Sequence, residues 1–406
     1  MKGAVMTSGP QATRWTAVLL IVAAGVVAAL QVGKAAIGAP LLQADLGISL
    51  TAIGWLTGIF AVLGIVGGIP VGALVGSVGA RRLLIAGLLM TAAGAALGAL
   101  AGGLAMLMLT RVVEGAGFLL IIVAAPSLLS AVARPSDQDL AFALWSCFMP
   151  VGMALAMLVG PLLADWRMIW WASSALCVGL CLPGLLILPS DASRRPWSWS
   201  GLRMDTLAVL RAGTPVGLAV VFALYSLMFF ALFSFLPVLL MERMEVSHQT
   251  AGLLSALVSA VNVLGNLAAG VLLSRGVPRA GVLMVACLVM GGAGVGIFEP
   301  ALADEAVLAL CLLFSTVAGL VPATLLASAP IAVPVAAQAP VVIGLIVQGN
   351  NLGQILGPTA VGNVIDAHGW GAAAYVVAGA SLCAAAVALM FGRRLHSHAT
   401  AREPHL

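Results

Sequence analysis

The chain has 406 residues, of which 62% are hydrophobic and only 8% are charged. A soluble domain is usually about one-quarter charged, and a mean hydropathy of +1.15 exceeds what a water-soluble core can absorb. This composition excludes an ordinary water-soluble protein and predicts one whose solvent is lipid. The six cysteines lie in apolar runs without a CxxC pair, so we expect neither extracellular disulfides nor a metal site.

Twelve apolar segments are long enough to cross a bilayer, which takes roughly 20 residues each. The predicted spans, in chain order, are 15–42, 51–76, 82–103, 105–132, 139–164, 168–189, 214–240, 249–274, 279–298, 305–329, 338–364 and 369–392. The tenth and eleventh share one uncharged stretch, which we divide at its prolines because proline interrupts helices: Pro330, Pro334 and Pro340. The first run is too long for a cleavable signal, so it counts as a span.

The basic residues indicate how these spans are oriented. If the N-terminus lies inside, all but four of the 18 Lys and Arg residues fall on the cytoplasmic side. The exceptions are Arg167 and Arg243 in outer loops, with Lys34 and Arg111 inside spans. The asymmetry follows the positive-inside rule. It predicts an inner-membrane protein with both termini cytoplasmic, and it explains the net charge of +4 without a nucleic-acid partner.

A polar stretch at 190–213 separates two halves of six spans each. Short matches recur between the halves at a nearly constant offset of 197–199 residues, pairing Pro40 with Pro237, Thr51 with Thr250, Gly72 with Gly270, and Gly160 with Gly357. Such regularity indicates an internal duplication, a transporter design in which the site lies between the repeats. We expect an N-terminal repeat at 1–189, a cytoplasmic linker at 190–213 and a C-terminal repeat at 214–406.

Arg111 and Glu114 are charged residues inside the fourth span, and their spacing places them on one helix face. A charge at bilayer depth costs at least about 2.5–3.5 kcal/mol, so such residues persist beside a partner charge, water or substrate. Lys34 and Gln31 lie at the same depth in the first span. One interpretation is that these cations, with Gln31, bind an anionic substrate while Glu114 carries a proton. The alternative is an internal ion pair that locks the bundle.

The second half offers amides at these depths instead of charges. Polar residues recur with helical spacing along span eight, namely Ser255, Ser259, Asn262 and Asn266. A second polar group lies on span eleven, namely Gln348, Asn350, Asn351 and Gln354. Amides both donate and accept, so they can orient a polar ligand. We predict substrate contacts for Tyr225 of span seven and for four amides: Asn262, Asn266, Gln348 and Asn351. The alternatives are hydrogen bonds between helices for the amides and an interfacial anchor for Tyr225.

Other regular patterns have simpler explanations. Glycines recur every four residues on spans two and three, at Gly64, Gly68, Gly72 and Gly76, then at Gly94, Gly98 and Gly102. Small residues let helices pack closely or slide, and we expect packing. A methionine series on span five suits copper(I) but is also ordinary apolar filling: Met149, Met153 and Met157. His248 and His368 lie at outer helix ends, where solvated histidines are expected.

Three stretches resemble signature motifs of the major facilitator superfamily, and the resemblance covers essentially the whole chain. The loop between spans two and three is similar to the superfamily's signature loop in its glycines and basic end: Gly72, Gly76, Gly79, Arg81 and Arg82. Gly76 replaces the acidic residue that, in the family, helps to latch the cytoplasmic side. The chain also has a slight likeness to cyanate-permease-type transporters.

The other two motifs lie in spans four and five. The fourth span resembles the superfamily's motif with a membrane-embedded arginine, which is often tied to proton coupling: Arg111, Gly115 and Gly117. The pair Gly160-Pro161 is similar to a glycine-proline motif common in proton-driven exporters, and Gly357-Pro358 repeats it in the second half.

The resemblance implies an all-α membrane protein with twelve transmembrane helices in two six-helix pseudo-symmetric repeats. With the charged residues, it predicts a monomeric secondary active transporter, coupled to protons, for a small organic anion or similar polar metabolite. The alternatives are a proton-driven drug or metabolite exporter, a copper(I) importer and a channel. No catalytic motif or nucleotide-binding loop occurs, so we expect neither an enzyme nor a cofactor. The expected partners are the substrate, protons and the bilayer.

Overall fold

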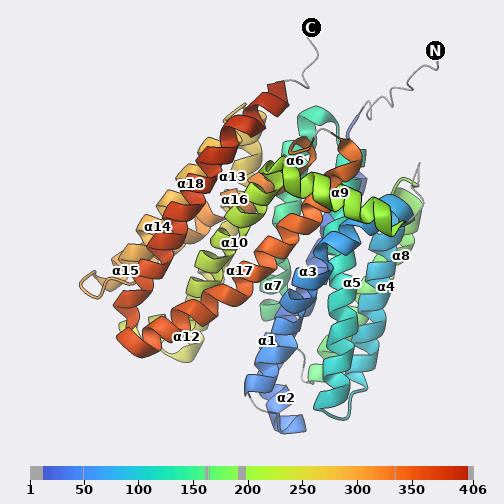
Figure 1. Ribbon diagram of the computed structural model, residues 1–406. Coiled ribbons are helices and arrows are strands. Elements are labelled where there is room, and N and C mark those ends of the chain that lie inside the picture. The colour runs from blue at the N-terminus through green and yellow to red at the C-terminus, as the bar shows by residue number, and fades with distance from the viewer. Residues whose placement is uncertain are drawn as a thin grey trace, which may run out of the picture.

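The computed structural model describes residues 12–400 apart from 49, 161, 162, 164, 191–197 and 334. This part of the chain consists of helices and turns, with no strand. Within it, 12 helical segments are long and apolar enough to cross a membrane, which is the number predicted from hydropathy. They form one bundle, with most helices running along its long axis (Figure 1). The all-α, twelve-span fold class is therefore confirmed.

The first six spans make up the N-terminal half. Its helices are α1 (Trp15–Ile37), α2 (Ala39–Leu46), α3 (Leu50–Val78), α4 (Ala80–Ala99), α5 (Leu104–Val132), α6 (Gln138–Ser146), α7 (Phe148–Val159) and α8 (Trp166–Ile187). A 3-10 turn, η1 (Pro135–Asp137), precedes α6. Helix α9 (Trp199–Ala212) then leads to the second half.

The last six spans make up the C-terminal half. Its helices are α10 (Thr214–Phe233), α11 (Leu236–Met244), α12 (His248–Ala260), α13 (Asn262–Ser274), α14 (Arg279–Ile297), α15 (Asp304–Ala318), α16 (Leu320–Ser328), α17 (Ala339–His368) and α18 (Ala373–Thr400). Three 3-10 turns join them, namely η3 (Ala329–Ile331), η4 (Ala336–Gln338) and η5 (Trp370–Ala372).

Several spans are broken into two helices where the sequence weakens the hydrogen-bond ladder. The break between α1 and α2 falls at Gly38, just before Pro40, and the break between α10 and α11 precedes Pro237. Proline in the first turn of a helix loses no helical hydrogen bond, so it starts the second segment without cost. Span eight breaks at Val261, which interrupts the predicted polar series immediately before Asn262.

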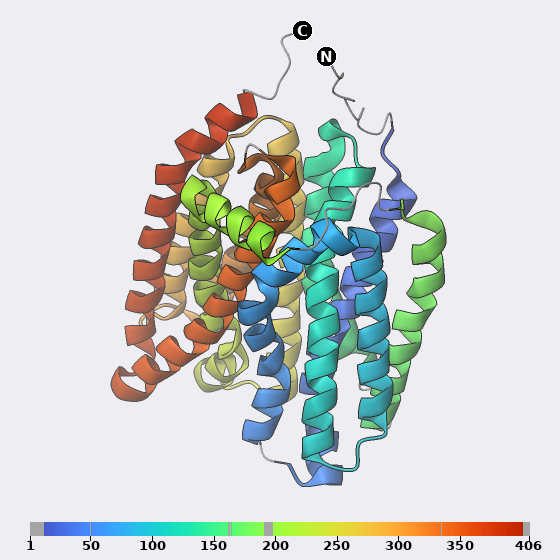
Figure 2. The ribbon, with the colours of Figure 1, turned by 45° about the vertical axis from the view of Figure 1, so that its right-hand side comes forward.

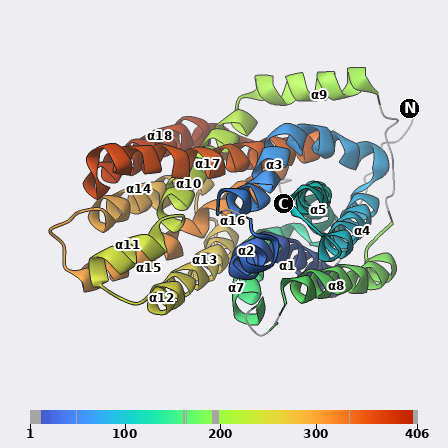
Figure 3. The same ribbon diagram turned by 90° about the horizontal axis from the view of Figure 1, so that it is seen from below.

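The two halves use the same helix pairings. In the N-terminal half α4 packs on α5 and α8, and α1 packs on α7; in the C-terminal half α14 packs on α15 and α18, and α10 packs on α17. This repetition is what duplication of a six-helix unit produces. Viewed along the bundle axis, the two halves lie side by side and α9 lies at the margin (Figure 3).

We call the end of the bundle where α1 begins and α18 ends the termini side; α9 also lies near it (Figures 1 and 2). Close contacts between the halves gather toward this side. There α6 packs on α13 and α16, and α3 packs along α17. Gly72 of α3 lies against Pro340, and Gly68 lies against Gly344. At the opposite end, α2 and α12 are set well apart (Figure 1).

The spans predicted at 51–76 and 82–103 correspond to α3 and α4, so most of the predicted signature sequence is helical. Helix α3 continues through Gly72 and Gly76 to Val78, and α4 begins at Ala80, which leaves only Gly79 between them. Gly79 has φ of +102°, a conformation that favours glycine and lets the chain reverse in one residue. Gly102, predicted to lie on span three, comes after the end of α4.

Candidate functional site

Three charged residues of the N-terminal half meet inside the bundle. Lys34 Nζ of α1 lies 2.9 Å from Glu114 Oε1 of α5, and Arg111 Nη1 pairs with Glu114 Oε2. All three residues have 0% relative exposure. We call this cluster the charge triad. An internal ion pair, the alternative interpretation from the sequence, is therefore present twice, and the two pairs share one carboxylate.

Aromatic rings and a backbone carbonyl complete the surroundings of the two cations. Lys34 Nζ lies 4.6 Å from the centre of the Trp170 ring, and Arg111 Cζ lies 4.2 Å from that of Phe60. Both geometries suit cation–π attraction, which strengthens when the cation is desolvated. Arg111 Nε also donates to the Leu56 carbonyl at 2.9 Å. Helices α1, α3, α5 and α8 therefore all contribute to the cluster.

Glycine makes room for the shared carboxylate. A Cβ on Gly94 of α4 would lie 2.8 Å from Glu114 Cγ, so a larger residue there would displace the acid. Gly115, one residue further along α5, lets the Phe60 ring approach, since its own Cβ would lie 2.8 Å from that ring. Gly117 faces Gly87 and Thr91 of α4. These glycines let α3, α4 and α5 pack tightly around the triad.

The formal charge of the triad is +1, because one carboxylate pairs with two cationic side chains. Arg111 Nη2 donates no hydrogen bond to any residue that the structure describes. Removing one partner from a buried ion pair typically costs about 3–5 kcal/mol, because the remaining charge is left without compensation. A change in the charge of Glu114 therefore changes the charge balance of the whole cluster.

Gln31 lies one turn before Lys34, and none of its hydrogen bonds in the described structure goes to the triad. Its Nε2 donates to the Val27 carbonyl at 3.1 Å and lies 3.8 Å from Cys177 Sγ of α8. The residue is fully buried, and its Oε1 has no partner among the described residues. The predicted role of Gln31 in substrate binding stays a prediction.

The amides predicted on span eight belong to a second buried group, in the C-terminal half. Asn262 Nδ2 donates to the Ser315 carbonyl of α15 at 2.9 Å, and Asn266 Nδ2 donates to Asn262 Oδ1 at 2.8 Å. Tyr225 hydrogen-bonds with the Asn262 side chain. Tyr225 lies in the middle of α10 and is 6% exposed, so the alternative of an interfacial anchor was wrong. We call these residues the amide group.

The amides of α17 face the other half instead. Gln348 Nε2 donates to the Ile65 carbonyl of α3 at 2.6 Å. Asn351 donates to its own helix, at the Val347 carbonyl, and its amide fills the space left by Gly64 of α3. The structure therefore does not bring all the predicted substrate contacts together. It divides them among the charge triad, the amide group and the α3–α17 interface.

The remaining motif residues lie on or next to four helices, α3, α4, α7 and α17. Arg81, in the first turn of α4, donates to the Leu185 carbonyl, and the side chain of Arg82 is exposed. Gly76 has no neighbour close to where its Cβ would be, whereas Gly357 lies against the Leu227 carbonyl of α10. Gly160 lies against Ile37 of α1, and Pro161 lies outside the described residues. Pro358 lies inside α17.

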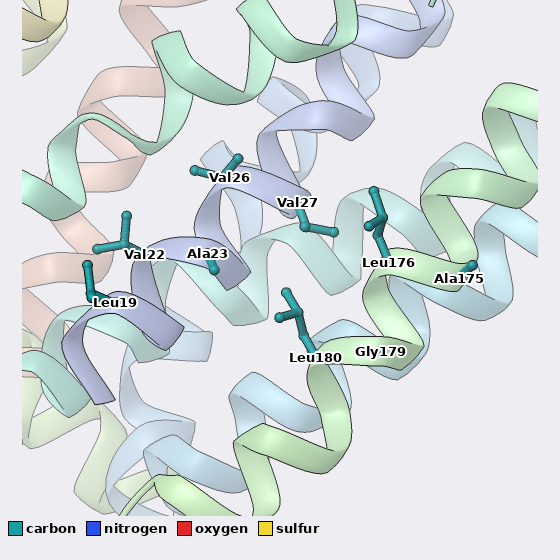
Figure 4. A pocket seen from close by; sticks show the side chains of 9 residues that line it. All are labelled: Leu19, Val22, Ala23, Val26, Val27, Ala175, Leu176, Gly179 and Leu180. Atoms are coloured by element: carbon teal, nitrogen blue, oxygen red, sulfur yellow. The ribbon is translucent and has the colours of Figure 1, made fainter. Parts of the chain in front are cut away.

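Neither prominent hollow of the described structure contains the triad. One, of about 450 Å³, lies between α1 and α8 and is lined by apolar residues such as Val26 and Leu180 (Figure 4). The other, of about 480 Å³, lies between α11, α17 and η5, and Pro358 and Glu242 line it. In this conformation the triad is enclosed by protein.

The methionine series of span five and the two histidines are the remaining features predicted from the sequence. Met149 and Met153 lie half-buried on α7, and the side chain of Met157 lies outside the described residues, as does that of His248. In the described part of the chain, no three His, Cys, Asp or Glu residues cluster to hold a metal ion. His368 is exposed at the end of α17. The copper hypothesis stays untested.

Sequence reasoning missed several residues around these sites. Phe60 and Trp170, whose rings contact Arg111 and Lys34, were not singled out from the sequence. An ion pair between the halves was also missed: Arg279 Nη2 of α14 lies 2.9 Å from Asp139 Oδ1 of α6. It pairs an acid at the start of span five with a base at the start of span nine.

By its fold and buried charges, the chain is a helical membrane protein with twelve spans. Residues 19–346 match the family model described as Major Facilitator Superfamily, so the chain belongs to that superfamily of transporters. A structure of the human organic anion transporter MFSD10 (TETRAN) has the same fold, with a TM-score of 0.77 over 92% of this chain and 98% of that one, at 18% identity. The resemblance predicted from the motifs is confirmed at the level of the superfamily.

Three proteins of Streptomyces are similar to part of the chain. A probable actinorhodin transporter of Streptomyces coelicolor is 29% identical over 44% of this chain and 32% of its own. The puromycin resistance protein pur8 of Streptomyces alboniger is 28% identical over 45% of this chain and 37% of its own length. The tetracenomycin C resistance and export protein of Streptomyces glaucescens is 26% identical over 47% of this chain and 36% of its own length. The chain thus spans about a third of the length of these relatives.

Proposed function

We propose that the protein is a proton-coupled secondary transporter that exports small organic molecules by alternating access, with Glu114 carrying the coupled proton. One observation carries this proposal: in the interior of a membrane protein, Glu114 is the one acid among the described residues that pairs with Lys34 and Arg111. Ionisable residues at such depth commonly serve in proton relays. A bundle held only by static pairs would need no excess cation.

The triad links protonation to conformation through its charge balance. A proton on Glu114 neutralises the acid that pairs with both Lys34 and Arg111. The two cations then need water or another anion, so conformations that open the space between α1 and α5 become relatively more stable. Loss of the proton restores both ion pairs and favours the closed arrangement. Such differential stabilisation of two states is what coupling requires.

Export is supported by the packing of span five and by the relatives. Gly160, from the motif that resembles those of proton-driven exporters, packs on Ile37 of α1, three residues beyond Lys34. Gly152 packs on the same helix at Ala29. Movement of α7 on substrate binding would therefore displace the helix that carries Lys34. Two of the similar Streptomyces proteins are named for resistance, and one of these also for export.

The second candidate is transport of a small organic anion. It is favoured by the excess positive charge of the triad and by the Arg111 Nη2 group, which has no partner among the described residues. An entering carboxylate would supply the missing negative charge. In either case we place the protein in the inner membrane with both termini cytoplasmic, on the basis of its basic loops.

A proteoliposome assay distinguishes loss of proton coupling from loss of folding. Wild type, Glu114→Gln and the matched control Glu305→Gln, an exposed acid on α15, are reconstituted into proteoliposomes with ethidium and benzoate as probes. We expect Glu114→Gln to lose accumulation driven by a pH gradient while it keeps exchange of the same probe without a gradient. Glu305→Gln should behave as wild type. Gradient-driven accumulation by Glu114→Gln at the wild-type level would refute proton coupling through this residue.

The candidates differ in what they need from the cations. If Lys34→Gln and Arg111→Gln both accumulate benzoate as the wild type does, the anion candidate is wrong. Ethidium transport by a chain that excludes benzoate supports the exporter.

A further inference from the structure

Helix α9 (Trp199–Ala212) is the one long helix in Figure 1 that runs across the bundle instead of along it. It lies near the termini side, outside α3, α10 and α17, at the margin of the molecule (Figure 3). It packs against these three helices only weakly, through few residues. Most of its surface therefore faces away from the protein.

The inner face of α9 is nevertheless held in place. Val209 is buried at 1% exposure, and Asp205 accepts a hydrogen bond from Gln338 Nε2, just before α17, at 3.3 Å. Ser198 caps the first turn by accepting from the Gly201 amide at 2.9 Å. Gly213, with φ of +75°, turns the chain sharply into α10. The helix is thus docked in one rotational setting, which fixes the face that points outward.

The outward face combines apolar and basic side chains. Met204, Leu207 and Leu210 follow one another every three residues and are 70%, 38% and 42% exposed. Arg203 and Arg211 lie on the same exposed face, beside the apolar residues. Residues spaced by three and four share one side of a helix, so the two kinds of side chain form one continuous strip opposite Val209.

The place of this strip in the bundle identifies what covers it. Neighbouring spans expose apolar residues such as Val66 of α3 and Val220 of α10 to the surrounding lipid. The strip on α9 continues that lipid-facing surface near its termini-side edge, where phospholipid headgroups lie. A helix with an apolar face flanked by arginines lies in this interface, with its apolar side chains among the acyl chains and its cations at the phosphates. Anionic lipids add an electrostatic attraction for each arginine.

We propose that α9 is an interfacial helix that binds anionic phospholipid: Met204, Leu207 and Leu210 insert at the headgroup–acyl boundary, while Arg203 and Arg211 contact the phosphates. Because α9 touches α3 of one half and α17 of the other, bound lipid also restrains the interface between the halves. This lipid site is separate from the charge triad, and it does not depend on which solute is transported.

Depth of insertion is measured directly. Met204→Cys is made together with Cys383→Ser, which removes the exposed native cysteine, and is labelled with an environment-sensitive fluorophore. Ser136→Cys, exposed in η1, is the matched water-facing control. In nanodiscs containing lipid spin-labelled near the headgroup, we expect quenching at 204 at least threefold stronger than at 136. Equal quenching at the two positions would overturn the insertion of α9.

The preference for anionic lipid is tested by charge removal. Thermal midpoints are compared in nanodiscs of phosphatidylcholine with and without phosphatidylglycerol, for the full chain. We expect phosphatidylglycerol to raise the midpoint of the wild type and of a control, Arg134→Gln with Arg275→Gln, which removes two exposed basic residues elsewhere. Arg203→Gln with Arg211→Gln should lose that rise. If the control loses it equally, or no chain shows it, lipid binding by α9 is refuted.

Discussion

Replacing Glu114 by glutamine removes the only acid of the charge triad while keeping its shape. Lys34 and Arg111 would remain as two buried cations, with a single amide oxygen in place of a carboxylate that now accepts from both. All three residues are 0% exposed, so solvent does not screen them. We therefore expect the full cost of orphaning a buried partner, a loss of about 3–5 kcal/mol in the free energy of unfolding.

A second variant makes the reasoning specific to charge balance. Lys34→Met removes the excess cation, leaves the Arg111–Glu114 pair balanced, and keeps an apolar side chain of similar length against Trp170. Its loss of stability should be clearly smaller than that of Glu114→Gln. In the double variant the second substitution should recover part of the loss, because only one buried cation then remains.

The assay is unfolding in mixed dodecyl maltoside and SDS micelles, followed by the fluorescence of the nine tryptophans. Glu305→Gln, an exposed acid, serves as the control and should unfold as the wild type does. A loss below about 1 kcal/mol for Glu114→Gln, the size of an ordinary substitution, would refute the idea that this carboxylate holds both cations. Equal losses for Lys34→Met and Glu114→Gln would show that packing, not charge, determines the stability.

Two further predictions concern ion pairs outside the triad. Asp139→Asn removes the acid that pairs with Arg279 of the other half, where both side chains are about one-fifth exposed, and should lower the free energy of unfolding by about 1.5–3 kcal/mol. It should also increase maleimide labelling of a cysteine introduced where α6 packs on α13. Unchanged labelling would contradict the idea that this pair helps to hold the two halves together. At the opposite end, hydrogen bonds from Trp166 and then Arg167 lower the pKa of Asp45. A carboxyl whose pKa is lowered by folding stabilises the fold above its ordinary pKa, and this stabilisation is lost as the pH falls through the folded-state pKa. The melting temperature of Asp45→Asn should therefore lie below that of the wild type at pH 7 and approach it below about pH 4. A difference that widens in acid would contradict this prediction.

The fold was largely predictable because lipid imposes a simple rule on the sequence. Every span needs a long apolar segment, and the described structure contains 12 of them. The breaks within spans were harder to predict. Pro40 and Pro237 mark two of them, but the break at Val261 has neither proline nor glycine at its centre. The local sequence therefore carries no proline or glycine signal for the break at Val261.

The site was predictable in its residues but not in its connections. Alternating span direction placed Lys34 at the depth of Arg111 and Glu114, and the three do meet. Helical spacing alone did not reveal that one carboxylate takes both cations. It also grouped Asn351 with the substrate contacts, whereas the absence of a side chain at Gly64 brings that amide into the interface between α3 and α17. Close approach across the halves depends on both helices at once, which a single-helix pattern cannot show.

The charge triad lies wholly within the N-terminal half, whereas the amide group lies wholly within the C-terminal half. Selection can therefore act on the two separately. Under the proposed function, substitutions around Asn262 and Tyr225 would alter which substrate is accepted and leave the network around Glu114 unchanged. A lineage in which the proposed roles hold would diversify its substrates by point mutation in one repeat and keep the proton-coupling residue of the other.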